Sequence, residues 1–343
     1  MKVLVLFKPN KKYDNFEGTR MRKSIKGALE LLNVSHTDSK VDYFEIAHLV
    51  SPESEKEMDE IKEYGSPIVV SALYTEDDPT ASYLEYKGKQ DKASILTSKA
   101  IKFLNKADMI LVPCEAAGDI LKEAGIEKPI YPCFPGVNLA RFDFSKEEEK
   151  EIFYRYYRED KNKKLVIAVG EYNARMEGIS SFINAAKKCP NAIFYYIGRL
   201  KMRNKISMRL KRFMKTAPKN VKFIDVPPDD IYRSALLNAD VFMIPGYKKA
   251  GVTSIIEAMA AKTQIIARKQ TNFNGILEDG VNAHLAEFSE TLTSLTRDYL
   301  DGKIKPTTLQ AYQQICNHSL TEYGEELMKY YQKAIEEKVN RRL

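Results

Sequence analysis

The chain has 343 residues and a formal net charge of +7, with 44% apolar and 29% charged residues. A chain of this length usually forms two domains, and the composition is that of an ordinary soluble globular protein. No uninterrupted apolar run approaches the length of a membrane span, which excludes a helical membrane-spanning protein.

Short apolar runs alternate with helical patterns along the first half. The start, "KVLVLF" (2–7), has few apolar residues before Lys8, so we expect a first strand and not a signal peptide. The other strands expected in this half cover 41–47, 67–74, 108–113 and 129–137, and the expected helices cover 18–32, 92–107 and 115–125. Such alternation predicts a parallel sheet with helices on both faces.

The same pattern repeats after a highly charged helical stretch (141–164), which we expect to bridge two domains. Strands are expected at 164–170, 192–198, 221–226, 240–246 and 263–269, and helices at 178–189, 229–239 and 253–261. The tail (319–343) is expected to form one long amphipathic helix. The sequence thus predicts an α/β protein of two Rossmann-like domains with a cleft between them, and ligands at the carboxyl ends of strands.

Positive charge is concentrated in one stretch. Residues 199–219 include nine basic residues and no acidic one, and Met202, Ile206, Leu210 and Phe213 recur at helical spacing. The stretch is either a solvated helix covering the domain or a patch that meets phosphates, anionic lipid or nucleic acid. No RNA-recognition, zinc-finger or helix-turn-helix signature is found, so no nucleic-acid partner is expected.

Cysteine and histidine usage bears on location and metal binding. Four cysteines (Cys114, Cys133, Cys189 and Cys316) lie far apart without a CxxC pair, which favours a reducing compartment and a cytoplasmic location. None of the four histidines has metal-ligand spacing from another, so no metal site is expected.

Several blocks resemble, in order, those of one family. They are "ADMILVPCEAAGDILKEAGI" with "PGVNLARF" (107–142), "LVIAVGEYNARMEGISSFINAA" (165–186), "NADVFMIPGYKKAGVTSIIEAMAAKTQIIA" (238–267) and "GVNAHL" (280–285). Together they resemble GT-B glycosyltransferases, nearest to glycosyltransferase family 4, the group 1 transferases. The third block is the specific one, and the resemblance covers nearly the whole chain.

The resemblance implies a GT-B fold, in which two Rossmann-like domains face each other across a cleft. Residues 1–150 would form the N-terminal acceptor-binding domain, and residues 151–318 the C-terminal domain that binds a nucleotide-sugar donor. The helix 319–343 would pack back onto the first domain.

Within the third block, Glu257 resembles the family's glutamate that holds the ribose hydroxyls of the nucleotide sugar. A carboxylate suits this role because it accepts two hydrogen bonds from vicinal hydroxyls. The preceding "GVTS" places backbone N–H groups of Gly251, Val252, Thr253 and Ser254 at a helix start, which favours a diphosphate. The structural alternatives are that Thr253 or Ser254 is only the helix N-cap and that Glu257 is capping or solvated.

Two further glycines are assigned to the donor site by the resemblance. Gly170 ends the first expected strand of the donor domain, and Gly198 ends the next one. Base recognition in such domains often uses backbone groups, here around Gly198 or residues 225–227.

The diphosphate-binding charges depart from the family pattern. The family has an arginine after its first donor-domain glycine and a lysine six residues on, but here Glu171 and Glu177 stand at those positions. Arg175 in the same loop, or Lys248 or Lys249 where the family has an acid, is a candidate catalytic replacement. The reaction requires cationic stabilisation of the departing nucleoside diphosphate, from whichever side chain. The alternative is that these cations are solvated and the enzyme is slow or inactive.

The first domain matches the family less closely. Gly18 and Thr19 correspond weakly to a glycine-rich loop beside the leaving phosphate, although a lone glycine before a helix is often only a turn. The family often has a histidine after a middle strand; here Tyr74 stands nearest and is the remaining catalytic candidate. The acids at 76–78 either contact an acceptor, act as a base, or cap the next segment.

These observations predict a glycosyltransferase of the hexosyltransferase type that moves a sugar to an acceptor hydroxyl. The resemblance implies retention at the anomeric carbon and catalysis without metal, with the nucleotide-diphosphate sugar as substrate and no cofactor. The acceptor is a glycan, a lipid or a protein, and the stretch 199–219 is a candidate contact with an anionic membrane surface. The alternatives are a non-catalytic GT-B-like binding or scaffold protein, and another two-Rossmann enzyme that uses nucleotide sugars, such as an epimerase or a phosphorylase-like protein.

Overall fold

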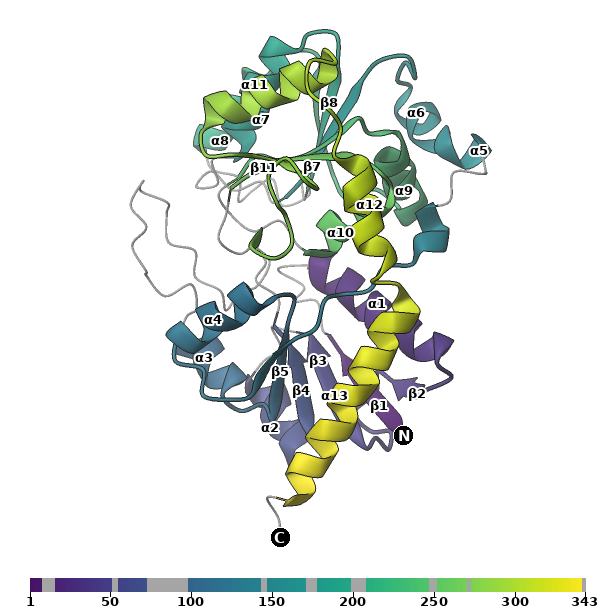
Figure 1. Cartoon of the computed structure of the whole chain (residues 1–343), viewed down its shortest axis with the longest axis vertical. Coiled ribbons are helices and arrows are strands. Elements are labelled where there is room, and N and C mark those ends of the chain that lie inside the picture. Colours follow the sequence, from purple (N-terminus) through teal and green to yellow (C-terminus); the bar gives the residue numbers. More distant parts are fainter. Residues whose placement is uncertain are drawn as a thin grey trace. The chain divides into compact units, whose positions relative to one another are not determined.

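The computed structural model describes residues 1–7, 16–50, 55–72, 98–142, 147–170, 178–198, 208–246, 252–269 and 273–340. The chain forms two compact units (Figure 1). Unit 1 comprises Met1–Asn138, Gly251–Thr253 and Asn317–Leu343, and unit 2 comprises Leu139–Ala250 and Ser254–Cys316. The predicted α/β class is confirmed, since each unit has a six-stranded parallel sheet with helices between its strands.

Unit 1 is built on a sheet with the strand order β2-β1-β3-β4-β5-β6. Its strands are β1 (Lys2–Leu6), β2 (Ser35–Thr37), β3 (Ile46–Val50), β4 (Ile68–Ser71), β5 (Met109–Val112) and β6 (Ile130–Pro132). Every residue of β3, β4 and β5 is buried, as expected for parallel strands covered on both faces. The strand predicted at 41–47 is displaced: β3 begins at Ile46, and Val41 and Tyr43 are exposed.

The helices of unit 1 are divided between the two faces of this sheet. The crossover through α1 (Phe16–Leu31) runs toward β2, whereas those through α2 (Glu55–Glu63), α3 (Ser98–Leu104) and α4 (Glu115–Glu123) run the other way. Because parallel crossovers are right-handed, α1 covers one face and the other three helices cover the opposite face.

The C-terminal helix α13 (Leu320–Asn340) shares the face covered by α1 (Figure 1). Its buried residues recur every three or four positions: Leu320, Tyr323, Gly324, Leu327, Tyr331 and Ala334. This apolar stripe joins one core with residues of β1, β3, β4, β5 and α1. Unit 1 is therefore completed by a segment distant in sequence.

A buried histidine links α13 to the sheet. His48 in β3 is 0% exposed, and its Nδ1 lies 2.6 Å from the Tyr331 hydroxyl. Its Nε2 lies 2.8 Å from the Ser71 hydroxyl at the end of β4. Burial disfavours the charged imidazolium and lowers the pKa of His48 from 6.5 to about 3.

We expect this histidine to make the protein less stable in mild acid. The unfolded chain protonates His48 near pH 6.5 and the folded chain only near pH 3, so stability is fully present above pH 6.5 and lost as pH falls toward 3. Between pH 6 and pH 5 ordinary carboxylates stay charged. In this range the free energy of unfolding, measured with urea, should fall by an amount approaching 1.4 kcal/mol per pH unit. His48→Gln should remove this histidine's share of the slope and leave the share of His318, whose pKa is also lowered by burial. His284→Gln, which alters a histidine in contact with the Lys305 carbonyl, should keep the slope. Equal slopes in both variants would contradict the assignment.

Unit 2 has a second parallel sheet, with the strand order β12-β11-β10-β7-β8-β9. Its strands are β7 (Leu165–Val169), β8 (Ile193–Ile197), β9 (Val221–Ile224), β10 (Val241–Ile244), β11 (Gln264–Arg268) and β12 (His284–Ala286). The helices α7 (Gly178–Lys188) and α8 (Met208–Lys215) cover one face, where α11 (Ser289–Leu300) packs beside α7. Right-handed crossovers place α9 (Asp229–Asn238) and α10 (Val252–Ala260) on the other face, and α12 (Thr308–Cys316) follows α11.

The charged stretch expected to bridge two domains belongs to unit 2 instead. It forms η1 (Leu139–Phe142), α5 (Glu147–Lys150) and α6 (Ile152–Tyr157). Phe153 is fully buried and stacks edge-on against Tyr195 of β8, with ring centroids 4.9 Å apart. The charge pattern suggested a bridge between domains, but buried aromatic residues on α6 hold the stretch to unit 2.

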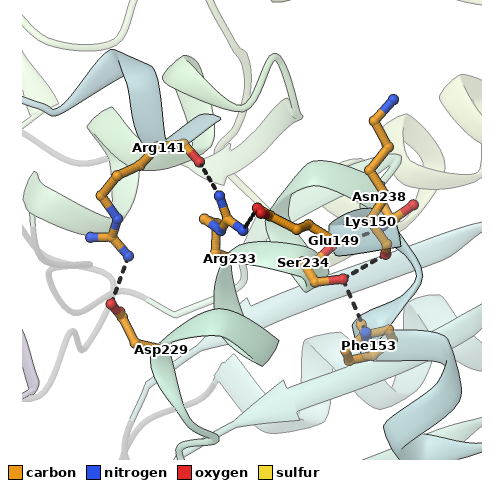
Figure 2. A network of polar contacts seen from close by, with 8 residues as sticks. All are labelled: Arg141, Glu149, Lys150, Phe153, Asp229, Arg233, Ser234 and Asn238. Carbon is orange, nitrogen blue, oxygen red and sulfur yellow. Dashed lines mark hydrogen bonds and ion pairs between the residues drawn. The ribbon is translucent and has the colours of Figure 1, made fainter. Parts of the chain in front are cut away.

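Polar contacts with α9 fix the same stretch (Figure 2). The Arg233 guanidinium donates to the Arg141 carbonyl over 2.9 Å and also pairs with Glu149. Ser234 and Asn238 each donate to the Lys150 carbonyl over 2.6 Å. Because these partners are carbonyl groups and one carboxylate, the contacts satisfy the end of α5 as well as joining it to α9.

Candidate functional site

The sheet of unit 2 changes its winding direction between β7 and β10, which are neighbours. From β7 the chain passes through α7 to β8, and from β10 it passes through α10 to β11 on the other side. Both helices therefore begin at the carboxyl edge of the sheet beside this pair of strands. In open α/β sheets, such a switch point is where ligands bind.

The backbone is tightly packed at this point. A Cβ on Gly178, the first residue of α7, would lie 3.0 Å from the backbone nitrogen and 3.1 Å from the Cα of Gly246. It would also lie 3.3 Å from Cγ of Pro245. The start of α7 thus lies directly against the chain leaving β10. Gly178 and Gly246 were not among the predicted site residues, although each is a glycine beside a predicted strand-to-helix loop.

The start of α10 carries four predicted donor-site residues, Val252, Thr253, Ser254 and Glu257. Thr253 and Ser254 are each 3% exposed, and Glu257 is half-buried. Residues three and four apart share one side of a helix, so Thr253 and Ser254 lie one turn before Glu257 on its side. No acidic residue stands in the first turn of α7 or α10, so the positive ends of both helix dipoles meet the switch point.

The two predicted glycines at strand ends already use their amides. Gly170 donates its N–H to the Ile197 carbonyl over 3.0 Å, and Gly198 donates to the Ile224 carbonyl over 3.0 Å. These bonds extend the sheet by one residue at each strand. Because neither glycine carries a side chain, a ligand can approach the backbone closely at both positions.

In unit 1, Gly18 and Thr19 belong to the first turns of α1, which begins two residues earlier than predicted. A Cβ on Gly18 would lie 2.5 Å from Cζ of Phe7. The packing of Phe7 thus requires glycine at this position, whatever its role toward a ligand. Thr19 is half-buried.

Among the residues that the structure describes, no three His, Cys, Asp or Glu side chains gather as a group that could hold a metal ion. In the same ranges, no helix combines the length and the apolar character needed to cross a bilayer.

The chain is similar to known glycosyltransferases. Residues 149–314 match the family model described as "Glycosyl transferases group 1". The processive diacylglycerol alpha-glucosyltransferase of Acholeplasma laidlawii is 24% identical over 319 residues, spanning 90% of this chain and 91% of that protein. The alpha-galactosylglucosyldiacylglycerol synthase of Streptococcus pneumoniae (strain ATCC BAA-255 / R6) is 25% identical over 169 residues, which cover 48% of this chain and 43% of that protein.

A solved structure agrees over the whole chain. The crystal structure of Anabaena Alr3699/HepE in complex with UDP and glucose has a TM-score of 0.69 and 14% sequence identity, covering 97% of this chain and 100% of that one. The chain has the GT-B fold of glycosyltransferases. The predicted resemblance to GT-B glycosyltransferases is therefore confirmed, while the narrower resemblance to family 4 stays a prediction.

Several predicted site residues of this GT-B protein lie outside the described residues. They are the catalytic candidates Arg175, Lys248, Lys249 and Tyr74, the donor-site residue Gly251, the substituted positions Glu171 and Glu177, and the acids at 76–78. Gly170 directly follows β7 and Glu257 lies in α10, the helix after β10, so both belong to segments that border the switch point.

The described part of the basic stretch forms α8. Met208, Lys211, Arg212 and Lys215 are exposed and follow one another at helical spacing, while Met214 packs on the core of unit 2. Lys219 and Lys222 beyond the helix are also exposed. Unit 2 therefore presents a basic helix face that includes one exposed methionine, Met208.

Proposed function

We propose that this GT-B protein transfers a hexose from a nucleotide-sugar donor to a lipid hydroxyl, with retention at the anomeric carbon and without a bound metal. The observation that carries the proposal is the donor signature around Glu257, which lies in the second turn of α10, the helix that begins beside the switch point of unit 2. The match of residues 149–314 to group 1 glycosyl transferases supports transfer to an acceptor as the reaction.

The donor and acceptor classes follow from the similar proteins. Alr3699/HepE is solved in complex with UDP-glucose, and the Acholeplasma laidlawii relative is a diacylglycerol alpha-glucosyltransferase. We therefore propose UDP-glucose as the donor to test first and diacylglycerol as the acceptor.

The proposed chemistry breaks the bond between the anomeric carbon and the β-phosphate oxygen and forms a bond to the acceptor oxygen. The nucleoside diphosphate leaves with the bonding electron pair, and its departing oxygen takes the proton of the acceptor hydroxyl. The helix starts of α7 and α10 favour the growing negative charge through their dipoles and backbone amides. Glu257 would hold the ribose, which positions the donor for this step.

The test is a turnover assay with UDP-glucose and diacylglycerol in mixed micelles. We expect UDP release coupled to a glucosylated lipid, unchanged by EDTA, and an α-linked product if the configuration is retained. UDP binding by calorimetry without turnover on any acceptor would favour the alternative, a non-catalytic binding protein. This alternative is supported by Glu171 and Glu177, which stand where the family has cations.

We further propose that Arg175, Lys248 or Lys249 neutralises the leaving diphosphate in place of the substituted family cations. Replacing all three with alanine should lower kcat by roughly a hundredfold or more, the size expected for losing charge stabilisation in the transition state. The matched control replaces Lys122, Lys161 and Lys303, exposed lysines that change the net charge equally. Unchanged transfer in the triple variant would refute the compensation.

The exposed basic face of α8 supports peripheral contact with an anionic membrane, where a lipid acceptor would be found. Sedimentation with vesicles containing anionic lipid should show binding at low salt that weakens at high salt. Changing Lys211, Arg212 and Lys215 to glutamine should weaken it, while the same change at Lys122, Lys161 and Lys303 should not. Equal binding by both variants would refute α8 as the contact.

A further inference from the structure

Arg268 is an unusual residue in the core of unit 2. It is the last residue of β11, it is 0% exposed, and it is the largest fully buried side chain among the described residues. Burying a guanidinium is costly unless its donors find acceptors. The sequence "TQIIARK" predicted only a strand here, and no site role was assigned to this arginine.

The donors of Arg268 contact residues at four separate elements. Nε donates to the Pro245 carbonyl over 3.4 Å at the end of β10, and Nη1 donates to the Glu287 carbonyl over 2.8 Å after β12. Nη2 donates to Ser181 over 3.4 Å and also to Ser289. The hydroxyls of Ser181 and Ser289 lie 2.9 Å apart, which closes the network between α7 and α11.

Two of these contacts reach the elements that border the switch point. Ser181 lies in the first turn of α7, and Pro245 directly precedes Gly246. Gly246 is the residue whose backbone lies against Gly178 at the start of α7. Arg268 therefore connects the start of α7 to the chain leaving β10 from the buried side, one strand away from the pair β7 and β10.

We propose that Arg268 is a positioning residue for the donor diphosphate. It holds the start of α7 and the end of β10 at a fixed distance from each other. At this distance, the starts of α7 and α10 can both face the phosphates. The side chain is fully buried, so it acts through the backbone carbonyls and serine hydroxyls that it contacts and not by touching the ligand. This role rests on the proposed function, because it assumes that a nucleotide diphosphate binds at this edge of the sheet.

The same strand offers a matched control at its other end. Gln264, the first residue of β11, is 1% exposed and exchanges two hydrogen bonds with Thr307, each 2.8 Å long. Replacing Gln264 removes a buried polar network of unit 2 at the amino edge of the sheet, away from the switch point. Substitution of Arg268 or of Gln264 should therefore lower general stability, but only substitution of Arg268 should disturb donor positioning.

The experiment compares Arg268→Met, Arg268→Lys and Gln264→Met with the unaltered protein, each well below its own Tm. We expect the Kd for UDP and the KM for UDP-glucose to rise roughly tenfold in Arg268→Met. Arg268→Lys, which keeps a charge but not the planar fork, should recover only part of the affinity and serves if Arg268→Met does not fold. Gln264→Met should keep UDP affinity within about twofold.

Hydrogen exchange without ligand gives a second, independent readout. Amides from Gly178 to Ser181 and that of Gly246 should exchange faster in Arg268→Lys, but not in Gln264→Met. Folded Arg268 variants with unaltered UDP affinity, or equal losses in the Gln264 variant, would overturn the proposal. If the unaltered protein does not bind UDP while the exchange pattern changes as expected, the donor assignment fails and Arg268 is only a structural clamp.

Discussion

Glu257→Ala should reduce the affinity for UDP and for UDP-glucose by roughly a hundredfold, while the protein stays folded. The proposed ribose contact consists of two hydrogen bonds to a carboxylate, each worth about 1.5–3 kcal/mol. A loss of about 3 kcal/mol corresponds to roughly a hundredfold in Kd. Glu257 is half-buried on one side of α10, so its removal leaves the buried Thr253 and Ser254 in place.

Calorimetric titration with UDP measures this effect directly, and thermal shift gives a faster check, because a ligand at a hundredfold its Kd stabilises by about 2.7 kcal/mol. The matched control is Glu290→Ala, which removes an exposed glutamate from the first turn of another helix of unit 2. Glu257→Gln should fall between the two, since an amide keeps one acceptor oxygen. Unchanged UDP binding by Glu257→Ala would remove this residue from the donor site.

Gly136→Ala should destabilise unit 1 by about 3 kcal/mol, the upper end of the usual cost of overpacking. A Cβ at this position would lie 2.6 Å from Cβ of Tyr323 and 2.9 Å from the Ser319 carbonyl oxygen at the start of α13. The neighbouring bonds are also short, since Ser24 donates to the Gly136 carbonyl over 2.5 Å. The added methyl group therefore has to displace α13 as a whole, together with its contact to His48.

Urea unfolding followed by circular dichroism tests this prediction, with Gly118→Ala as the control. Gly118 lies inside α4, and a Cβ there would meet Cγ2 of the half-buried Ile130 at 3.3 Å, so the neighbour has to give by only a few tenths of an ångström. Alanine is also favoured over glycine in a helix by about 1 kcal/mol, so this variant should be close to neutral. Equal stability of the two variants would show that α13 tolerates the methyl group.

Some elements could not be predicted because their cause is not local. β2 (Ser35–Thr37) has no apolar pattern and exists through its pairing with β1. The stretch 141–164 has the composition of a solvated linker, yet Phe153 and the contacts of Arg233 attach it to unit 2. Gly18 resembled a ligand loop, and only the folded chain reveals the ring of Phe7 against it.

Amino-acid sequence alone determined the alternation of strands and helices, the parallel α/β class and the donor signature around Glu257. These follow from short-range patterns: apolar runs, helix periodicity, and a glycine before a helix start. Tertiary structure decided that His48 is buried uncharged and that Arg268 joins α7 to β10. For α13, the family resemblance implied packing on the first domain, and the structure supplied the residues that make the contact. Each of these depends on contacts between residues far apart in the chain. A local sequence pattern does not indicate which distant group will cover a given side chain.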